Sequence, residues 1–158
     1  MSMGEVYFYH LTERPLEVTL RVLLEKSLAA GWRVAVRGRT EALLDRIDDR
    51  LWLEPPDGFL PHGRTGGAEQ PVLLTSGAMG NDPHCLVSVE GAGVTPDEVA
   101  AMERVMVLFD GHDDGAVQGA REQWKTLTGA GVAAKYWSEA SGRWDMQAES
   151  GGASRDAV

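Results

Sequence analysis

The fold is decided by residues 6 to 36, which read VYFYHLTERPLEVTLRVLLEKSLAAGWRVAV. The first four of them form an aromatic and β-branched run that is typical of a buried strand. Leucines then recur at helical spacing from Leu16 to Leu28, with Thr12 as the expected cap, Pro15 at the first helical position and Gly31 as the stop. A second apolar run follows directly. This stretch therefore predicts a strand, an amphipathic helix and another strand.

The rest of the chain continues the same alternation. The further expected elements are a helix opened by Thr40, strands over Val72–Thr75 and Leu86–Val89, a capped helix from Thr95 to about Met102, a strand over Val105–Phe109, a helix capped by Asp113 that runs to about Leu127, and a hairpin within Ala133–Met146. Continuously apolar strands that alternate with amphipathic helices are typical of a mostly parallel sheet covered on both faces. We therefore predict a three-layer α/β fold.

Length and charge limit the class of protein. The chain has 158 residues and 17.1 kDa, which is the common size of one domain, so we expect a single domain over 1–147 and a flexible tail over 148–158. With 15 Lys and Arg against 24 Asp and Glu, the net charge is -9, which disfavours direct binding of nucleic acid, including single strands stacked on tryptophans. Contact with DNA is expected to be indirect.

Cysteine usage and hydropathy indicate the compartment. The lone Cys85 excludes an internal disulfide framework and every zinc site made of several cysteines, which fits a reducing cytosol. Arg or Glu interrupts each apolar run before a membrane-spanning length, and the N-terminus has no secretory pattern. We expect a cytoplasmic protein without a membrane partner.

Motifs for catalysis and cofactor binding are absent from the sequence. It contains no GxGxxG after the first strand, no GxxxxGK[ST], no GxSxG and no HExxH, so we expect no cofactor. His10 ends the first strand, where α/β enzymes often carry catalytic groups, although a hydrogen-bonded structural histidine explains it equally well. His84 beside Cys85 could suggest an activated thiol, but neighbouring strand residues point to opposite faces.

Acidic residues gather after the fifth expected strand. Asp110, His112, Asp113 and Asp114 could hold a divalent metal, but acidic residues at a helix start also satisfy free backbone N–H groups. We expect no metal site. A small nucleotide-binding protein or enzyme that uses the strand ends near His10 and Asp110 remains the alternative function.

Two segments carry aromatic residues that could anchor a partner. A proline-rich loop places Trp52, Phe59 and Pro61 on a stiff backbone, although Trp52 could instead be a core residue that ends a helix.

The last expected helix is the second such segment. There Trp124 borders the apolar stripe, and Arg121 and Lys125 form a basic pair along its edge. The alternative for this pair is an ion pair with Asp114 or Glu122.

These residues belong to a set of motifs through which the chain resembles the chi subunit of bacterial DNA polymerase III along nearly its whole length. The matching motifs are Phe8-Tyr9-His10-Leu11, Leu44-Asp45-Arg46, Leu51-Trp52, Phe59-Leu60-Pro61-His62, Ala120-Arg121-Glu122-Gln123-Trp124-Lys125, Tyr136-Trp137 and Gly142-Arg143-Trp144. The order and separation of these motifs also match that family.

The resemblance implies a Rossmann-like fold without a nucleotide site and a binding role in DNA replication rather than catalysis. Members of this family bind the acidic C-terminal tail of single-stranded DNA-binding protein, and in some bacteria a second face binds the psi subunit, which tethers chi to the clamp loader. Carried over by motif, the tail would bind in one pocket made of Trp52, Phe59 and Pro61 from the loop and Arg121, Trp124 and Lys125 from the helix.

Overall fold

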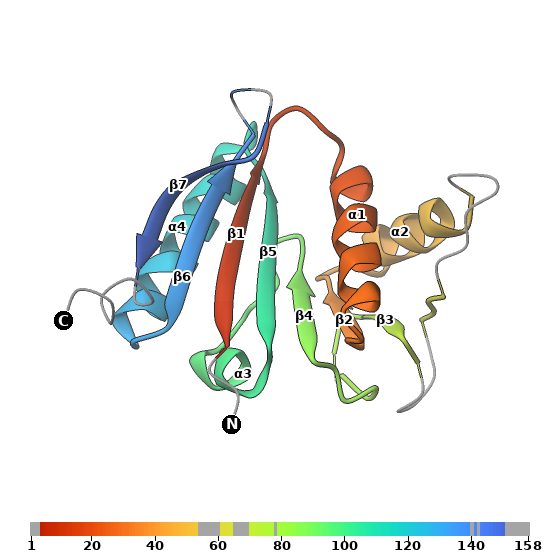
Figure 1. Ribbon diagram of the computed structural model, residues 1–158. Coiled ribbons are helices and arrows are strands. Elements are labelled where there is room, and N and C mark those ends of the chain that lie inside the picture. The colour runs from red at the N-terminus through yellow and green to blue at the C-terminus, as the bar shows by residue number, and fades with distance from the viewer. Residues whose placement is uncertain are drawn as a thin grey trace.

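The computed structural model describes residues 4–53, 61–64, 70–77, 79–139, 141 and 143–150 (Figure 1). Its elements are, in chain order, β1 (Glu5–Leu11), α1 (Leu16–Ala29), β2 (Val34–Arg37), α2 (Glu41–Leu53), β3 (Val72–Thr75), β4 (Cys85–Ser88), α3 (Pro96–Ala101), β5 (Arg104–Asp110), α4 (Asp114–Gly129), β6 (Ala133–Ser138) and β7 (Asp145–Ser150). The seven strands form one sheet in the order β3-β2-β4-β5-β1-β6-β7.

All neighbouring strands of this sheet are parallel except β6 and β7, which form the expected antiparallel pair. Side chains alternate between the two faces along each strand. In β1, Phe8 packs against α3 and α4, whereas Tyr7 and Tyr9 lie on the face that α1 and α2 cover. The two apolar cores on either side of the sheet confirm the Rossmann-like three-layer fold.

Local capping signals place α3 and α4 as predicted. The Thr95 side chain accepts from the Glu98 N–H and the Glu98 carboxylate accepts from the Thr95 N–H, which completes a capping box. Asp113 caps α4 by accepting from the Ala116 N–H at 3.1 Å. Gly31 has a φ of 84° after α1, a conformation that glycine adopts without strain, so it ends the helix as expected.

The expected cap of α1 is wrong. Thr12 lies before the helix, and Pro15, which takes the cap position, makes no side-chain cap. Instead, the carboxylate of Glu139 accepts from the N–H groups of Thr12, Glu13 and Arg14 at 2.9 to 3.2 Å. A distant acidic residue thus satisfies the backbone donors that lead into α1.

The C-terminal boundary also differs from the expectation. β7 continues to Ser150, and its last residues pair with β6, so residues 148–150 belong to the sheet rather than to a frayed tail. Residues 151–158 lie outside the described part of the chain.

Candidate functional site

Helix α4 presents the basic pair that the sequence singles out. Ala120 and Leu127 are buried against the sheet, and Trp124 is partly buried beside them. Arg121 and Lys125 are four residues apart on the exposed side of the helix. The α4 half of the predicted site is therefore a surface with two cations next to an indole.

Packing against the sheet holds the Trp124 ring in place. Its centroid lies 5.6 Å from that of Phe8 on β1 and 6.1 Å from that of Tyr136 on β6. Tyr136 stacks on Phe8 at 6.4 Å, and its hydroxyl lies 2.9 Å from Nδ1 of His10. Such contacts fix the aromatic wall before any partner arrives.

The two cations of this surface have no acidic partner among the described residues. No carboxylate of the described residues lies within ion-pairing distance of Arg121 or Lys125, and Glu122 accepts from Gln118 instead. The expected alternative, an ion pair with Asp114 or Glu122, is therefore wrong. Burial raises the pKa of Tyr136 while the positive charge of Arg121 opposes the change, so the guanidinium acts on the aromatic cluster.

Trp52 of the loop half is exposed rather than part of the core. Its side chain is 48% exposed at the end of α2, and its ring lies 4.4 Å from that of the buried His62. Asp48 holds this histidine, with 3.0 Å between Oδ1 and Nε2. Pro61 is partly buried nearby in the sequence, and Phe59 lies outside the described residues. The interpretation of Trp52 as a core residue is wrong.

The structure does not bring the two halves together. Helix α2 connects β2 to β3 at one end of the sheet and packs with α1 on one face, whereas α4 connects β5 to β6 on the opposite face (Figure 1). Trp52 therefore lies far from Arg121, Trp124 and Lys125, and the predicted single pocket is wrong. Because the two crossovers run on opposite faces, the chain has two separate aromatic surfaces.

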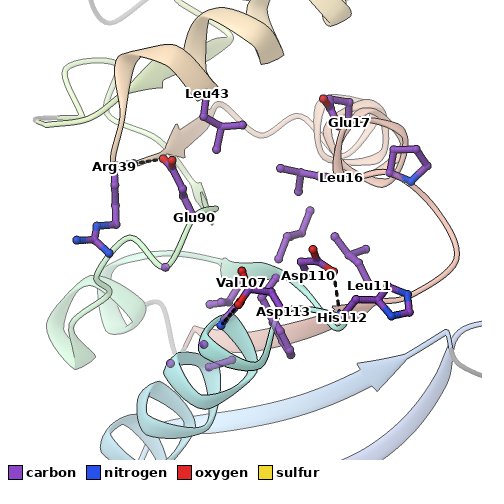
Figure 2. A pocket seen from close by; sticks show the side chains of 18 of the residues that line it. Leu11, Leu16, Glu17, Arg39, Leu43, Glu90, Val107, Asp110, His112 and Asp113 are labelled. Carbon is purple, nitrogen blue, oxygen red and sulfur yellow. Dashed lines mark hydrogen bonds between the residues drawn. The ribbon is translucent and has the colours of Figure 1, made fainter.

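A cavity lies at the carboxyl ends of the strands. It has a volume of about 1120 Å³ and opens between α1, α2 and the start of α4 (Figure 2). Strands β1 and β5 are neighbours, but the chain crosses from β1 to β2 in one direction and from β5 to β6 in the other. The cavity therefore lies at the point where the strand order reverses, which is where folds of this class bind ligands. We name it the switch-point cleft.

The switch-point cleft has a lining of mixed charge. Asp113 already fills the N-terminal end of α4, where a phosphate would otherwise bind. Glu17, Glu90 and Asp110 add three more carboxylates (Figure 2). The same cleft is also lined by Arg14, Arg39 and Arg46. Within the described residues no group of three potential ligands could hold a metal ion, and Asp110 accepts from the His112 N–H at 2.8 Å.

His10 and Cys85 have structural roles. The His10 ring packs 5.2 Å from that of Phe109 in addition to its contact with Tyr136. Cys85 is fully buried, and burial raises the pKa of its thiol to about 12, so the thiolate that nucleophilic chemistry needs does not form. Nδ1 of His84 accepts from the Arg33 N–H at 2.9 Å instead of contacting this thiol.

Comparison with protein families finds a related family. The family model described as DNA polymerase III chi subunit, HolC, matches residues 3–135, which is most of the chain. The chain belongs to the DNA polymerase III chi subunit family. A chi subunit is an accessory subunit of the polymerase, which agrees with the absence of nucleotide motifs from the sequence. A search among curated proteins found no match. Among the described residues of this chi-family chain, no helix has the length and apolar character to cross a membrane.

Some residues at these sites could not be found from the sequence. Glu90 lines the switch-point cleft and has a φ of 62°, an unusual conformation for a residue that is not glycine, and no sequence pattern marks it. His62 is present in the quoted Phe59 to His62 motif, but its burial under Trp52 follows from the fold alone. The separation of the two aromatic surfaces depends on strand order, which local sequence does not encode.

Proposed function

We propose that this protein binds the acidic C-terminal tail of single-stranded DNA-binding protein through the exposed side of α4. The observation that carries the proposal is that Arg121 and Lys125, beside the fixed ring of Trp124, have no acidic partner among the described residues of a chain with a net charge of -9. Cations with no partner in a chain so rich in carboxylates indicate a binding role for acidic groups of another molecule.

The chemistry of an acidic, apolar-ended tail suits this surface. A terminal carboxylate can accept two hydrogen bonds from the guanidinium of Arg121, and Lys125 attracts the acidic side chains of the tail. The last apolar side chain of the tail would pack against Trp124. Because a disordered tail loses entropy when it binds and the charges are exposed, we expect micromolar affinity that weakens with salt.

The second aromatic surface fits a different partner. Trp52 is exposed and its ring packs at a tilt against a buried histidine, so it can enter an interface without reordering. We assign this surface, with Pro61, to the psi subunit, which would connect the protein to the clamp loader. The opposite faces then allow both partners to bind at once.

A linking role without catalysis follows from this arrangement. Several tails on one coated strand raise the effective concentration of tail near the protein, so weak single contacts can hold the polymerase at its template. DNA is then contacted only through the coat protein, in the cytoplasm.

Titration calorimetry with a synthetic tail peptide tests the proposal. Arg121→Ala should reduce binding by about 2 kcal/mol or more, because a charge-assisted pair at an anchor position is lost. Arg143→Ala removes an arginine whose side chain is 84% exposed on the β6–β7 hairpin and serves as the control with unchanged affinity. Equal affinities of Arg121→Ala and the parent protein would remove α4 from the tail site.

A further inference from the structure

A small cavity lies at the amino ends of the strands, away from α4 and from the switch-point cleft. It has a volume of about 200 Å³ and is lined by Tyr9, Leu23, Lys26, Ser27, Ala30, Trp32, Arg104 and Met106. Two of these eight residues are cations and none is acidic, although acidic residues outnumber basic ones in the whole chain. We name it the donor cavity.

Arg104 contributes hydrogen-bond donors that nothing in the described structure uses. Its guanidinium carbon lies 4.3 Å from the ring centroid of Tyr7 and 5.4 Å from that of Trp32. Stacking uses the flat faces of a guanidinium and leaves its N–H edges free. The Nε atom is buried, and no described residue accepts a hydrogen bond from it.

Two other lining residues add donors of the same kind. The hydroxyl of Tyr9 and the ammonium group of Lys26 have no hydrogen-bond partner within the part of the chain that the structure describes. Burial raises the pKa of Tyr9 to about 12 although the charge of Arg104 opposes this, so the hydroxyl keeps its proton at neutral pH. Three different side chains thus offer donors to one small space.

Several backbone acceptors near the donor cavity are already occupied. The carbonyls of Lys26, Ser27 and Leu28 accept from the N–H groups of Ala30, Gly31 and Trp32 at 3.0 to 3.1 Å. The Ser27 hydroxyl donates to the Leu23 carbonyl at 2.8 Å. The lining therefore supplies positive charge and several side-chain donors but no carboxylate to match them.

We propose that the donor cavity binds a small oxyanion, the carboxylate or phosphate group of a partner molecule. An oxyanion supplies strong acceptors together with the negative charge that the lining residues lack. The cavity has room for such a group but is smaller than the sites that enclose whole ligands, so the rest of the partner would remain outside, against the indole of Trp32. This proposal does not depend on the tail site, because the two surfaces share no residue.

An NMR titration of the ¹⁵N-labelled full chain tests the proposal. Sodium phosphate and sodium acetate are added in separate titrations, with chloride keeping the ionic strength constant. We expect saturable shifts of the Arg104 Nε–H and Trp32 indole N–H signals that fit one Kd. Shifts with phosphate alone identify a phosphate group as the ligand, and shifts with acetate alone identify a carboxylate.

Charge-matched variants separate a built site from general attraction. Arg104→Gln should raise the Kd at least about tenfold, read from the Trp32 signal, because charge-assisted hydrogen bonds are lost. Lys26→Gln changes an exposed helical residue without risk to the fold and should raise the Kd about threefold. Arg39→Gln removes a charge at the opposite ends of the strands and should leave the Kd unchanged. The proposal is wrong if neither anion moves the two signals, or if Arg39→Gln weakens binding as much as Arg104→Gln.

Discussion

Glu139 shows how one side chain can replace a helix cap that the local sequence lacks. Its side chain is fully buried, and its carboxylate accepts hydrogen bonds from three backbone N–H groups and, at 2.8 Å, from Nη1 of Arg14. Burial raises the pKa of this carboxyl. The hydrogen bonds from residues 12–14 and the charge of Arg14 together lower the pKa by a larger amount, so the net change is downward. More than 120 residues separate the partners, so the sequence could not reveal the contact.

We predict that Glu139→Gln destabilises the protein by about 1–3 kcal/mol at neutral pH, because buried N–H groups lose a charged acceptor. A lowered folded pKa means that the carboxylate stabilises the fold above its unfolded pKa, about 4.3, and that this contribution is lost as the pH falls through the lower folded value. Urea unfolding of both proteins at several pH values measures this difference in the free energy of unfolding. Glu13→Gln, at an exposed neighbour, is the control with a change within about 0.5 kcal/mol. A destabilisation that stays constant from neutral to strongly acidic pH would contradict the assigned charge.

Elements bounded by local signals are the ones that the sequence predicts well. Thr95, Pro96 and Glu98 lie close together in the chain and define the start of α3, and Asp113 defines the start of α4. β7 was partly missed because its exposed residues carry no apolar pattern, and only pairing with β6 makes it a strand. Prediction fails where the stabilising contact comes from a distant segment.

Asp113→Ala should lower the free energy of unfolding by about 1 kcal/mol, because the Ala116 N–H loses its acceptor at the start of α4. Asp114→Ala removes the same charge from the first turn without removing the cap, so it should cost about 0.5 kcal/mol or less in physiological salt. Urea unfolding compares the two variants. Equal losses would mean that the cap contributes no more than the helix dipole.

The whole molecule separates the two surfaces that the sequence joins. Motif order identifies both the Trp52 segment and the α4 segment, but it does not state on which face of the sheet each crossover runs. That information lies in the strand order, where β2 and β3 occupy one end and β6 and β7 the other. The chain thereby presents one aromatic surface on each side of the sheet, which suits a protein that links two partners.

The most direct measurement is an ¹H–¹⁵N spectrum of the full chain with and without the synthetic acidic tail peptide, read at the indole N–H signals of Trp52 and Trp124. The account predicts a saturable shift of the Trp124 signal and an unchanged Trp52 signal, because the tail contacts α4 alone. A shift of Trp52 with Trp124 unchanged would contradict it and would place the tail on the α2 surface.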